Sequence, residues 1–406
     1  MSALQGDPES FVQYCMRRNL ETSQGDFLPR SEYGRYLTSL LNEAIASTTA
    51  TVSVDKVSAE VTGLKASASG VTLSLADLPP ITADHVLLAF GNLAPLTPKP
   101  FAGVKDHHSY QDSPWCQPCP PEGLGRPTDS VLLIGSGLTA LDMVTRLATQ
   151  GHTGKVVALS RRGLHPQVHR GHPHYAAQHA ETTRLALSKS PATARNYLKV
   201  VRRLVSQSPD VNWRDIIAAM RPCTPELWNR LTQIEKRRFL RHARPYWDNH
   251  RHRAAPEGNE IFDLWKQSGQ LTVAKGRVLS VDVADDQLIC RILQTTSRAV
   301  KVSAFDRVIN CTGPNTSVLK SASLLIKQLV EDGTIVSDPL ELGILLTNDF
   351  SVVTSKGIVL ERLSYVGPML KSLFWEATAV PELRQHVSAH AARLAQRFNH
   401  DVEQFS

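Results

Sequence analysis

A short glycine-containing segment in the middle of the chain constrains the fold more than any other feature of the sequence. Residues Val131–Ala140 have the sequence VLLIGSGLTA, in which two glycines join an apolar run to a helical pattern. Ser130–Ile134 is typical of a buried strand, Leu138–Gln150 of a helix and Lys155–Ser160 of a second strand. Together they predict a βαβ unit of about thirty residues, and hence an α/β fold with a parallel sheet.

The spacing of the small residues is that of a turn that binds dinucleotides. Gly135 permits a sharp turn, Gly137 lets the backbone approach a pyrophosphate, and Ala140 lets the helix lie close to the strand. The helix N-terminus would then offer unpaired N–H groups to the phosphates. The alternative is a tight turn with a purely structural role. We expect a nicotinamide-dinucleotide site at Gly135, Ser136, Gly137, Leu138, Thr139 and Ala140.

Ser160, Arg161 and Arg162 follow the second strand, where an acidic residue would bind the ribose diol of NAD. Arginines at this place suit a ribose 2′-phosphate instead. The sequence therefore favours NADPH over NADH, the alternative being that both arginines are simply solvated.

The length of 406 residues predicts two domains. Prolines accumulate from Pro95 to Pro127 and the periodicity is lost, which indicates a linker at the end of a first segment, residues 1–127. Residues 128–310 would form the nucleotide-binding domain, with a basic helical insertion over 182–253. Residues 311–406 would return to the first domain.

The first segment contains one predicted helix, residues 31–46, and three predicted strands, residues 51–57, 60–66 and 70–75. Two buried apolar strands, residues 84–90 and 306–310, end in small residues. In flavoprotein oxidoreductases with two dinucleotide domains, such strands return the chain from one domain to the other. The small residues are Gly91 and Asn92 after the first strand, and Thr312, Gly313 and Pro314 after the second.

Composition limits the partners. The net charge of +7 comes largely from residues 161–253, and no nucleic-acid-binding motif accompanies it, so we expect no nucleic acid and a small anionic substrate instead. Six cysteines and no apolar signal segment favour a reducing compartment, the cytoplasm. No apolar run approaches the roughly 20 residues that span a bilayer. The sequence is silent on oligomeric state.

Two clusters could suggest a metal, but we expect none. Cys116 and Cys119 form a CxxC pair in the proline-rich segment without a second pair to complete a zinc site. The histidines at 165, 169, 172, 174 and 179 have no carboxylate or cysteine at matching spacing. His250, Arg251 and Arg253 are better candidates for binding the carboxylate or imide oxygens of a substrate, the alternative being a basic helix end on the surface.

With these motifs in order, the chain resembles the YdhS-like FAD/NAD(P)-binding proteins, which include FAD-dependent urate hydroxylase and aspartate N-monooxygenase-like enzymes. The resemblance extends over nearly the whole chain. It rests on the segments Asp26–Arg30, Tyr33–Leu37, Tyr110–Trp115, Gly135–Asp142, Leu159–Gly163, Arg238–His242, Arg244–Trp247, His250–Arg253, Gly367–Pro368 and Phe374–Arg384.

The resemblance implies two Rossmann-like domains, FAD beside NADPH, and a monooxygenase-like reaction on a small molecule. Alternatives are an NAD(P)H-dependent flavin dehydrogenase or reductase without oxygenation, and an inactive nucleotide-binding protein. Family members begin with a further strand, GxGxxG turn and acidic residue, so we expect the first domain to be incomplete and FAD affinity to be reduced. The implied FAD-binding residues are Arg30, Gly91, Asn92, Thr312, Gly313, Pro314, Gly367, Pro368, Trp375, Glu376 and Val380.

Overall fold

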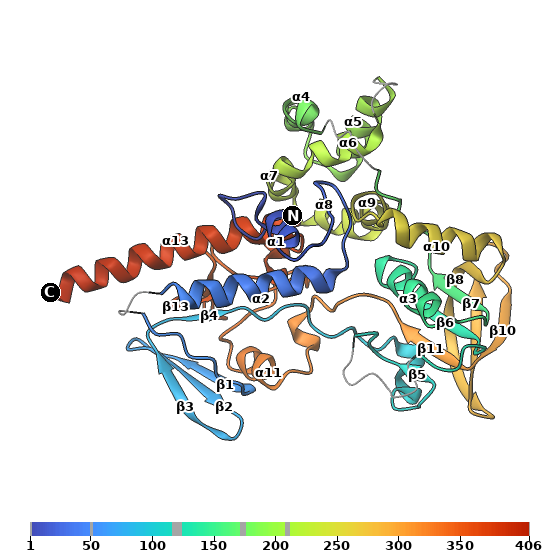
Figure 1. The fold of residues 1–406 in the computed structure, drawn as a ribbon, viewed down its shortest axis with the longest axis horizontal. Helices are drawn as coiled ribbons and strands as arrows, with labels where there is room; N and C mark the ends of the chain where they lie inside the picture. Colours follow the sequence, from blue (N-terminus) through green and yellow to red (C-terminus); the bar gives the residue numbers. More distant parts are fainter. Residues whose placement is uncertain (1, 49–51, 116–123, 171–175, 208–211, 406) are drawn as a thin grey trace. The chain divides into compact units, whose positions relative to one another are not determined.

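The computed structural model describes residues 2–48, 52–115, 124–170, 176–207 and 212–405 (Figure 1). The chain divides into two compact units. Unit 1 comprises Met1–Asn92, Thr224–Asn229 and Thr316–Ser406. Unit 2 comprises Leu93–Cys223 and Arg230–Asn315.

Unit 2 is built on a seven-stranded sheet with the order β10-β9-β8-β7-β6-β11-β5. Strands β8, β7, β6, β11 and β5 run parallel to one another, while β9 and β10 are antiparallel additions. The predicted βαβ unit is confirmed as β6, α3 (Leu138–Thr149) and β7. The strand bounds are β5 Tyr110–Gln111, β6 Val131–Ile134, β7 Val156–Ser160, β8 Leu271–Ala284, β9 Gln287–Gln294, β10 Val300–Phe305 and β11 Arg307–Asn310.

Both faces of this sheet are covered, which explains why β6 is apolar throughout. On one face, α3 and α10 (Pro256–Gln267) bury Met143, Phe262 and Trp265 against the strands. On the other face, the 3-10 helix η1 (Lys99–Val104) and the β8–β9–β10 hairpins bury Phe101 beside Tyr110, with ring centroids 5.2 Å apart.

The basic segment after β7 is helical, as predicted. Figure 1 shows α4, α5 and α6 gathered together, and side chains cap two of these helices. Thr193 accepts a hydrogen bond from the Asn196 N–H at 3.1 Å, and Asn212 accepts one from the Arg214 N–H at 3.0 Å. The bounds are α4 Ala176–Ser188, α5 Ala194–Ser206, α6 Trp213–Ala219, η2 Arg221–Cys223, α7 Thr224–Arg230, α8 Gln233–Arg238, the π-helical η3 Phe239–Ala243 and α9 Arg244–Arg251.

Unit 1 contains two small sheets and five α-helices outside α7 among its described residues. An antiparallel meander has the order β1-β2-β3, and a mixed sheet has the order β12-β13-β4, in which β4 runs parallel to β13. The bounds are α1 Ser10–Arg17, α2 Arg30–Ala46, β1 Val61–Ala66, β2 Val71–Leu75, β3 Leu78–Ala83, β4 Val86–Leu88, η4 Val318–Lys320, α11 Leu324–Glu331, β12 Ser351–Val353, β13 Val359–Tyr365, η5 Pro368–Leu370, α12 Lys371–Phe374 and α13 Val380–Phe405.

The sequence misplaced one strand of the meander. Residues 52–57, predicted as a strand, form none, and Thr51 lies outside the described residues. Val52, Val54 and Val57 are exposed, so their alternation reflects no buried face. The third strand is instead β3, which contains Pro79 and Pro80. It lies at the edge of the meander, where a residue without an N–H is tolerated.

The predicted linker over 95–127 also proved to be partly ordered structure. Tyr110 and Gln111 form β5, which pairs with β11 and extends the sheet of unit 2. The side chain of Phe101 is fully buried. Prolines removed the periodicity on which prediction depends, but η1 begins at Lys99 directly before Pro100, a position where proline fits a helix.

A hydroxyl group in unit 1 joins the partly buried His85 and the buried His390. The Oγ atom of Ser364 on β13 lies 2.8 Å from Nε2 of His85 and 2.9 Å from Nε2 of His390 on α13. Burial, followed by the charges of Arg397, His390 and Arg362, lowers the pKa of His85 to about 4. Burial also lowers the pKa of His390.

This arrangement predicts that unit 1 loses stability in mild acid. Because the folded pKa of His85 lies below the unfolded value of 6.5, the unfolded chain binds more protons between these values. The stabilisation by neutral histidine is therefore fully present above about pH 6.5 and is lost as the pH falls toward about 4. Urea denaturation at several pH values measures this slope. The His85→Gln variant should have a shallower slope, and an unchanged slope would contradict the assignment.

Candidate functional site

The turn after β6 is held between its two neighbouring strands. Gly135 has a φ of +118°, and a Cβ at this position would lie 2.4 Å from the carbonyl oxygen of Cys311, the residue after β11. The Gly135 N–H donates to the Leu159 carbonyl at 2.8 Å at the end of β7. Only glycine fits this backbone conformation and this approach. The chain must therefore leave the sheet here and enter α3.

The start of α3 presents free backbone donors. Gly137 is the N-cap residue, and no side chain of the described residues caps the helix. A Cβ built on Gly137 would meet no atom of the described residues within 4 Å, so the space beside Gly137 is open. Ala140 is fully buried, which lets α3 lie close to the sheet. An uncapped helix N-terminus with open space beside it suits a phosphate group.

Two predicted site residues are used to hold this turn. The Ser136 hydroxyl lies 2.7 Å from the Ser160 hydroxyl and also bonds the Leu164 carbonyl. The Gly163 N–H donates to Ser160 Oγ at 3.0 Å. Ser136 and Ser160 therefore join the turn after β6 to the turn after β7, and both turns lie at the same edge of the sheet.

The two arginines after β7 differ in their surroundings. Arg162 donates to the Arg241 carbonyl at 3.1 Å, and its guanidinium lies 5.7 Å from the Tyr246 ring centroid. Arg161 is exposed, and within the described part of the chain it forms no hydrogen bond or ion pair. Lys275 on β8, which pairs with Ser160, adds a second exposed cation that sequence reasoning missed. Its position beside β7 follows from strand pairing, which no local motif signals.

The FAD-assigned residues fall in both units. In unit 1, Gly91 and Asn92 follow β4 and are exposed, and Arg30 is the exposed first residue of α2. In unit 2, Thr312, Gly313 and Pro314 follow β11. Asn310 fixes this second loop, because its Oδ1 accepts from the Thr312 N–H at 3.2 Å and from the Thr312 hydroxyl at 2.7 Å.

Tyr365 brings two of the unit 1 segments together. Its hydroxyl donates to the Phe90 carbonyl at 3.1 Å, next to Gly91, and accepts from the Met369 N–H at 3.1 Å. Gly367 has a φ of +150°, and a Cβ there would lie 2.5 Å from that hydroxyl. The Gly367-Pro368 turn is therefore packed against the end of β4, as a shared site would require.

Trp375 and Glu376 are buried, unlike Gly91 and Asn92, and Val380 is partly buried. Trp375 is 4% exposed and stacks on Trp228 with ring centroids 4.7 Å apart, while Lys371 Nζ lies 4.6 Å from its ring centroid. Glu376 is also buried, and Val380 begins α13. The Trp375 side chain packs within unit 1.

The three predicted substrate residues lie in the last turn of α9 or just after it. His250 Nδ1 lies 2.7 Å from the Tyr246 carbonyl, and its ring contacts Trp213 edge-on at 5.0 Å. Arg251 and Arg253 are partly buried, and Arg253 belongs to a cluster of arginines described below.

No group of three or more potential metal-ligating side chains gathers among the residues that the structure describes. His165 stacks on Phe262 at 5.5 Å, and His169 Nδ1 lies 3.0 Å from the Arg170 carbonyl. Cys116, Cys119, His172 and His174 lie outside the described residues.

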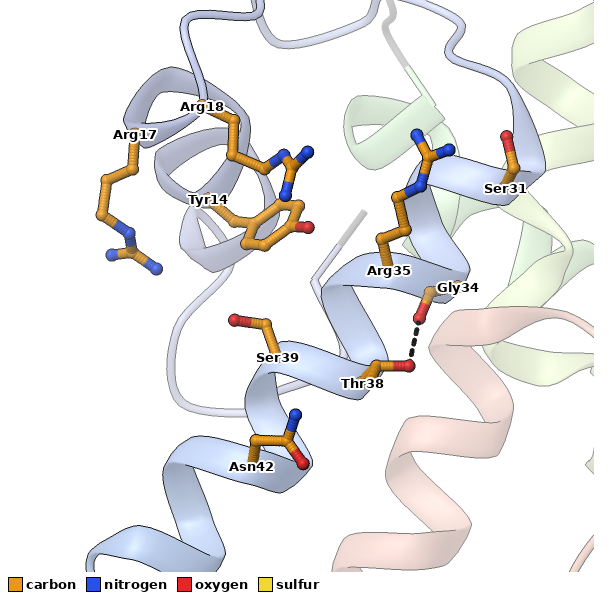
Figure 2. A pocket seen from close by; sticks show the side chains of 9 residues that line it. All are labelled: Tyr14, Arg17, Arg18, Ser31, Gly34, Arg35, Thr38, Ser39 and Asn42. Atoms are coloured by element: carbon orange, nitrogen blue, oxygen red, sulfur yellow. Dashed lines mark hydrogen bonds between the residues drawn. The ribbon is translucent and has the colours of Figure 1, made fainter.

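Sequence reasoning also missed a groove in unit 1. Figure 2 shows α1 and α2 side by side with the side chains that line this groove. The groove has a volume of about 700 Å³. Its lining residues are Tyr14, Arg17, Arg18, Ser31, Gly34, Arg35, Thr38, Ser39 and Asn42. The groove depends on α1, a helix that the sequence analysis did not predict, although Phe11, Tyr14 and Cys15 have helical spacing and are buried.

Known proteins support the fold. Residues 1–93 match a family model described as FAD-NAD(P)-binding. The structure is similar to L-lysine 6-monooxygenase from Pseudomonas syringae (TM-score 0.65, 16% identity, covering 97% of this chain and 83% of that chain). It is also similar to ornithine hydroxylase from Pseudomonas aeruginosa (0.56, 16%, 97% and 83%) and to ornithine N-hydroxylase from Kutzneria sp. 744 (0.57, 14%, 97% and 84%).

These similarities confirm the predicted fold class, the α/β architecture of flavoprotein oxidoreductases. No curated protein sequence matched the chain. In the described part of the chain, no helix combines the length and the apolar character needed to cross a bilayer.

The geometry of the turn predicts that two glycine substitutions differ in their effect on the free energy of unfolding. Gly135→Ala places a methyl group against the Cys311 backbone and should lower the free energy of unfolding by about 2 kcal/mol or more. Gly137→Ala meets open space and should change it by less than about 0.5 kcal/mol. Denaturant unfolding of both variants tests this. Equal destabilisation would contradict the described turn.

Proposed function

We propose that the chain is an NADPH- and FAD-dependent oxidoreductase of the monooxygenase type, acting on a small anionic molecule. The observation that carries the proposal is the uncapped N-terminus of α3, with open space at Gly137 and the exposed Arg161 on the neighbouring strand end. A structural turn would need neither the open space nor the exposed cation.

The described residues fit a nicotinamide dinucleotide. The N–H groups of Leu138 and Thr139 would bind the pyrophosphate, and the missing side chain at Gly137 leaves room for it. Arg161 would pair with the ribose 2′-phosphate, because its guanidinium is not otherwise engaged among the described residues. Arg162 would support this indirectly, by fixing the loop against Arg241 and Tyr246.

The fit to FAD is partial. Among the described residues, the glycine turn into α3 is the single strand–turn–helix cradle with the GxGxxA spacing. Unit 1 offers exposed backbone at Gly91, the packed turn at Gly367 and the cation of Arg30. Two observations support FAD: the FAD-NAD(P)-binding match over residues 1–93 and the flavoprotein fold. When bound, FAD would supply hydride acceptance and reaction with O₂.

The fold neighbours support the monooxygenase assignment. Those named above are an L-lysine monooxygenase and two ornithine hydroxylases, all acting on small molecules. The sequence motifs support a finer affiliation with the YdhS-like group. Reduction of a partner without oxygenation is the second candidate, and it is favoured if turnover proceeds equally without O₂.

The visible spectrum of the purified chain, recorded after adding FAD and then NADPH under air, tests the proposal. We expect flavin bands on the protein that bleach with NADPH and return with O₂. Arg161→Asp should slow bleaching by NADPH about tenfold or more and leave NADH little affected. Arg162→Asp is the matched control, with a smaller change in this selectivity. A colourless protein that binds NADPH without flavin would contradict the proposal that the chain is a flavin-dependent oxidoreductase.

A further inference from the structure

The loop that follows β7 reaches α9 and α6 and is fixed there by backbone pairing. The His169 N–H donates to the Ala254 carbonyl at 2.8 Å, and the Ala254 N–H donates to the Gln167 carbonyl at 2.9 Å. Val168 and Ala254 form a parallel bridge. This pairing places Arg170 and Arg253, which flank the two short segments, in the same part of unit 2.

A third arginine joins them from α6. Arg214 donates from Nε to the Val168 carbonyl at 2.9 Å, and its guanidinium lies 4.4 Å from the Trp213 ring centroid. Asp215, the next residue, is 2% exposed and bonds Arg170 Nη2 at 2.6 Å. Arg170, Arg214 and Arg253 around Asp215 are called the arginine cluster below.

The cluster carries more positive charge than its carboxylate neutralises. Among the described residues, the cations that act on Arg253 are Arg251, Arg214 and Arg170, and the one anion is Asp215. Burial and these cations lower the pKa of Arg253 to about 10, and burial with Arg170 lowers that of Arg214. Positive charge held away from water is costly unless an anion compensates it.

Hydrogen-bond donors in the cluster are also left over. The Nε atoms of Arg170 and Arg253 are buried and have no hydrogen-bond partner among the described residues. A buried donor without a partner is costly, so such donors in a folded protein point to a ligand that accepts from them. Guanidinium groups bind carboxylate and phosphate oxygens with two parallel hydrogen bonds.

We propose that the arginine cluster is a binding site for the carboxylate or phosphate group of a small molecule other than the dinucleotide. The cluster shares no residue with the turn at Gly135 and does not include Arg161, so the inference does not depend on whether the chain reduces a flavin. It assigns Arg170 and Arg214 a role that neither the sequence motifs nor the comparisons give them.

Calorimetry and thermal unfolding with inorganic phosphate and with malonate, each against sodium chloride at matched ionic strength, test the site on the full chain. We expect at least one of the two anions to bind and to raise the Tm by about 2 to 3 °C at about ten times its Kd. The tighter of the two identifies the group. No rise beyond that in chloride would overturn the proposal, whatever the variants do.

Arg253→Gln is the decisive variant. Removing this charge should weaken binding of the anion about 10- to 100-fold. In the absence of anions it should raise the Tm, because it relieves repulsion between the arginines of the cluster. A purely structural Arg253 would instead lower the Tm and leave anion binding intact. The matched control is Arg237→Gln, which removes an exposed cation from the same basic segment and should change neither quantity.

Two further measurements separate this site from the dinucleotide. The Arg161→Asp variant should keep its full response to phosphate or malonate. In the wild-type chain saturated with NADP⁺, phosphate or malonate should still raise the Tm by the same amount as without NADP⁺. If either change abolishes the anion response, the oxyanion binds at the 2′-phosphate position and the proposal is wrong.

Discussion

The close approach of Gly135 to the end of β11 is the contact on which the rest of unit 2 depends. Because β6 lies between β7 and β11, Gly135, the residue after β6, meets the Cys311 carbonyl on one side and donates its N–H to the Leu159 carbonyl on the other. The backbone therefore leaves the sheet at Gly135 and enters α3. This path places the N-terminus of α3 and the carboxyl ends of the strands at the same edge of the sheet, where ligands of open α/β sheets bind.

The sequence predicted this part of the structure well, because each step is local. The apolar run of β6, the glycines and the helical period of α3 lie within twenty consecutive residues or so. Features that depend on distant pairing were missed. Lys275 joins the site only because β8 pairs with β7, and β5 belongs to the sheet only because Tyr110 and Gln111 meet β11. The edge strand β3 was missed for a different reason: its pairing with β2 is local, but Pro79 and Pro80 argue against a strand.

Arg161, directly after β7, and Arg253, far beyond it along the sequence, have different roles for a physical reason. Arg161 is exposed to water, where an unpaired cation costs little. Arg253 is partly buried among other arginines, where the same charge is expensive. The charge of Arg161 is therefore stable without a partner, and its guanidinium is available to bind a ligand phosphate. The charge of Arg253 is costly unless an anion compensates it. The sequence named Arg253 as a candidate for binding a substrate carboxylate, but it could not place Arg170 and Arg214 near it, because those contacts join distant segments.

The central claim is that the turn into α3 binds a nicotinamide dinucleotide, and hydrogen–deuterium exchange with and without NADPH tests it most directly. We predict slower exchange at the backbone amides of Ser136–Ala140 and of Arg161–Gly163, because the phosphates would accept from the first and order the second. Unchanged exchange in both segments at saturating NADPH, with protection confined to other parts of the chain, would contradict the account.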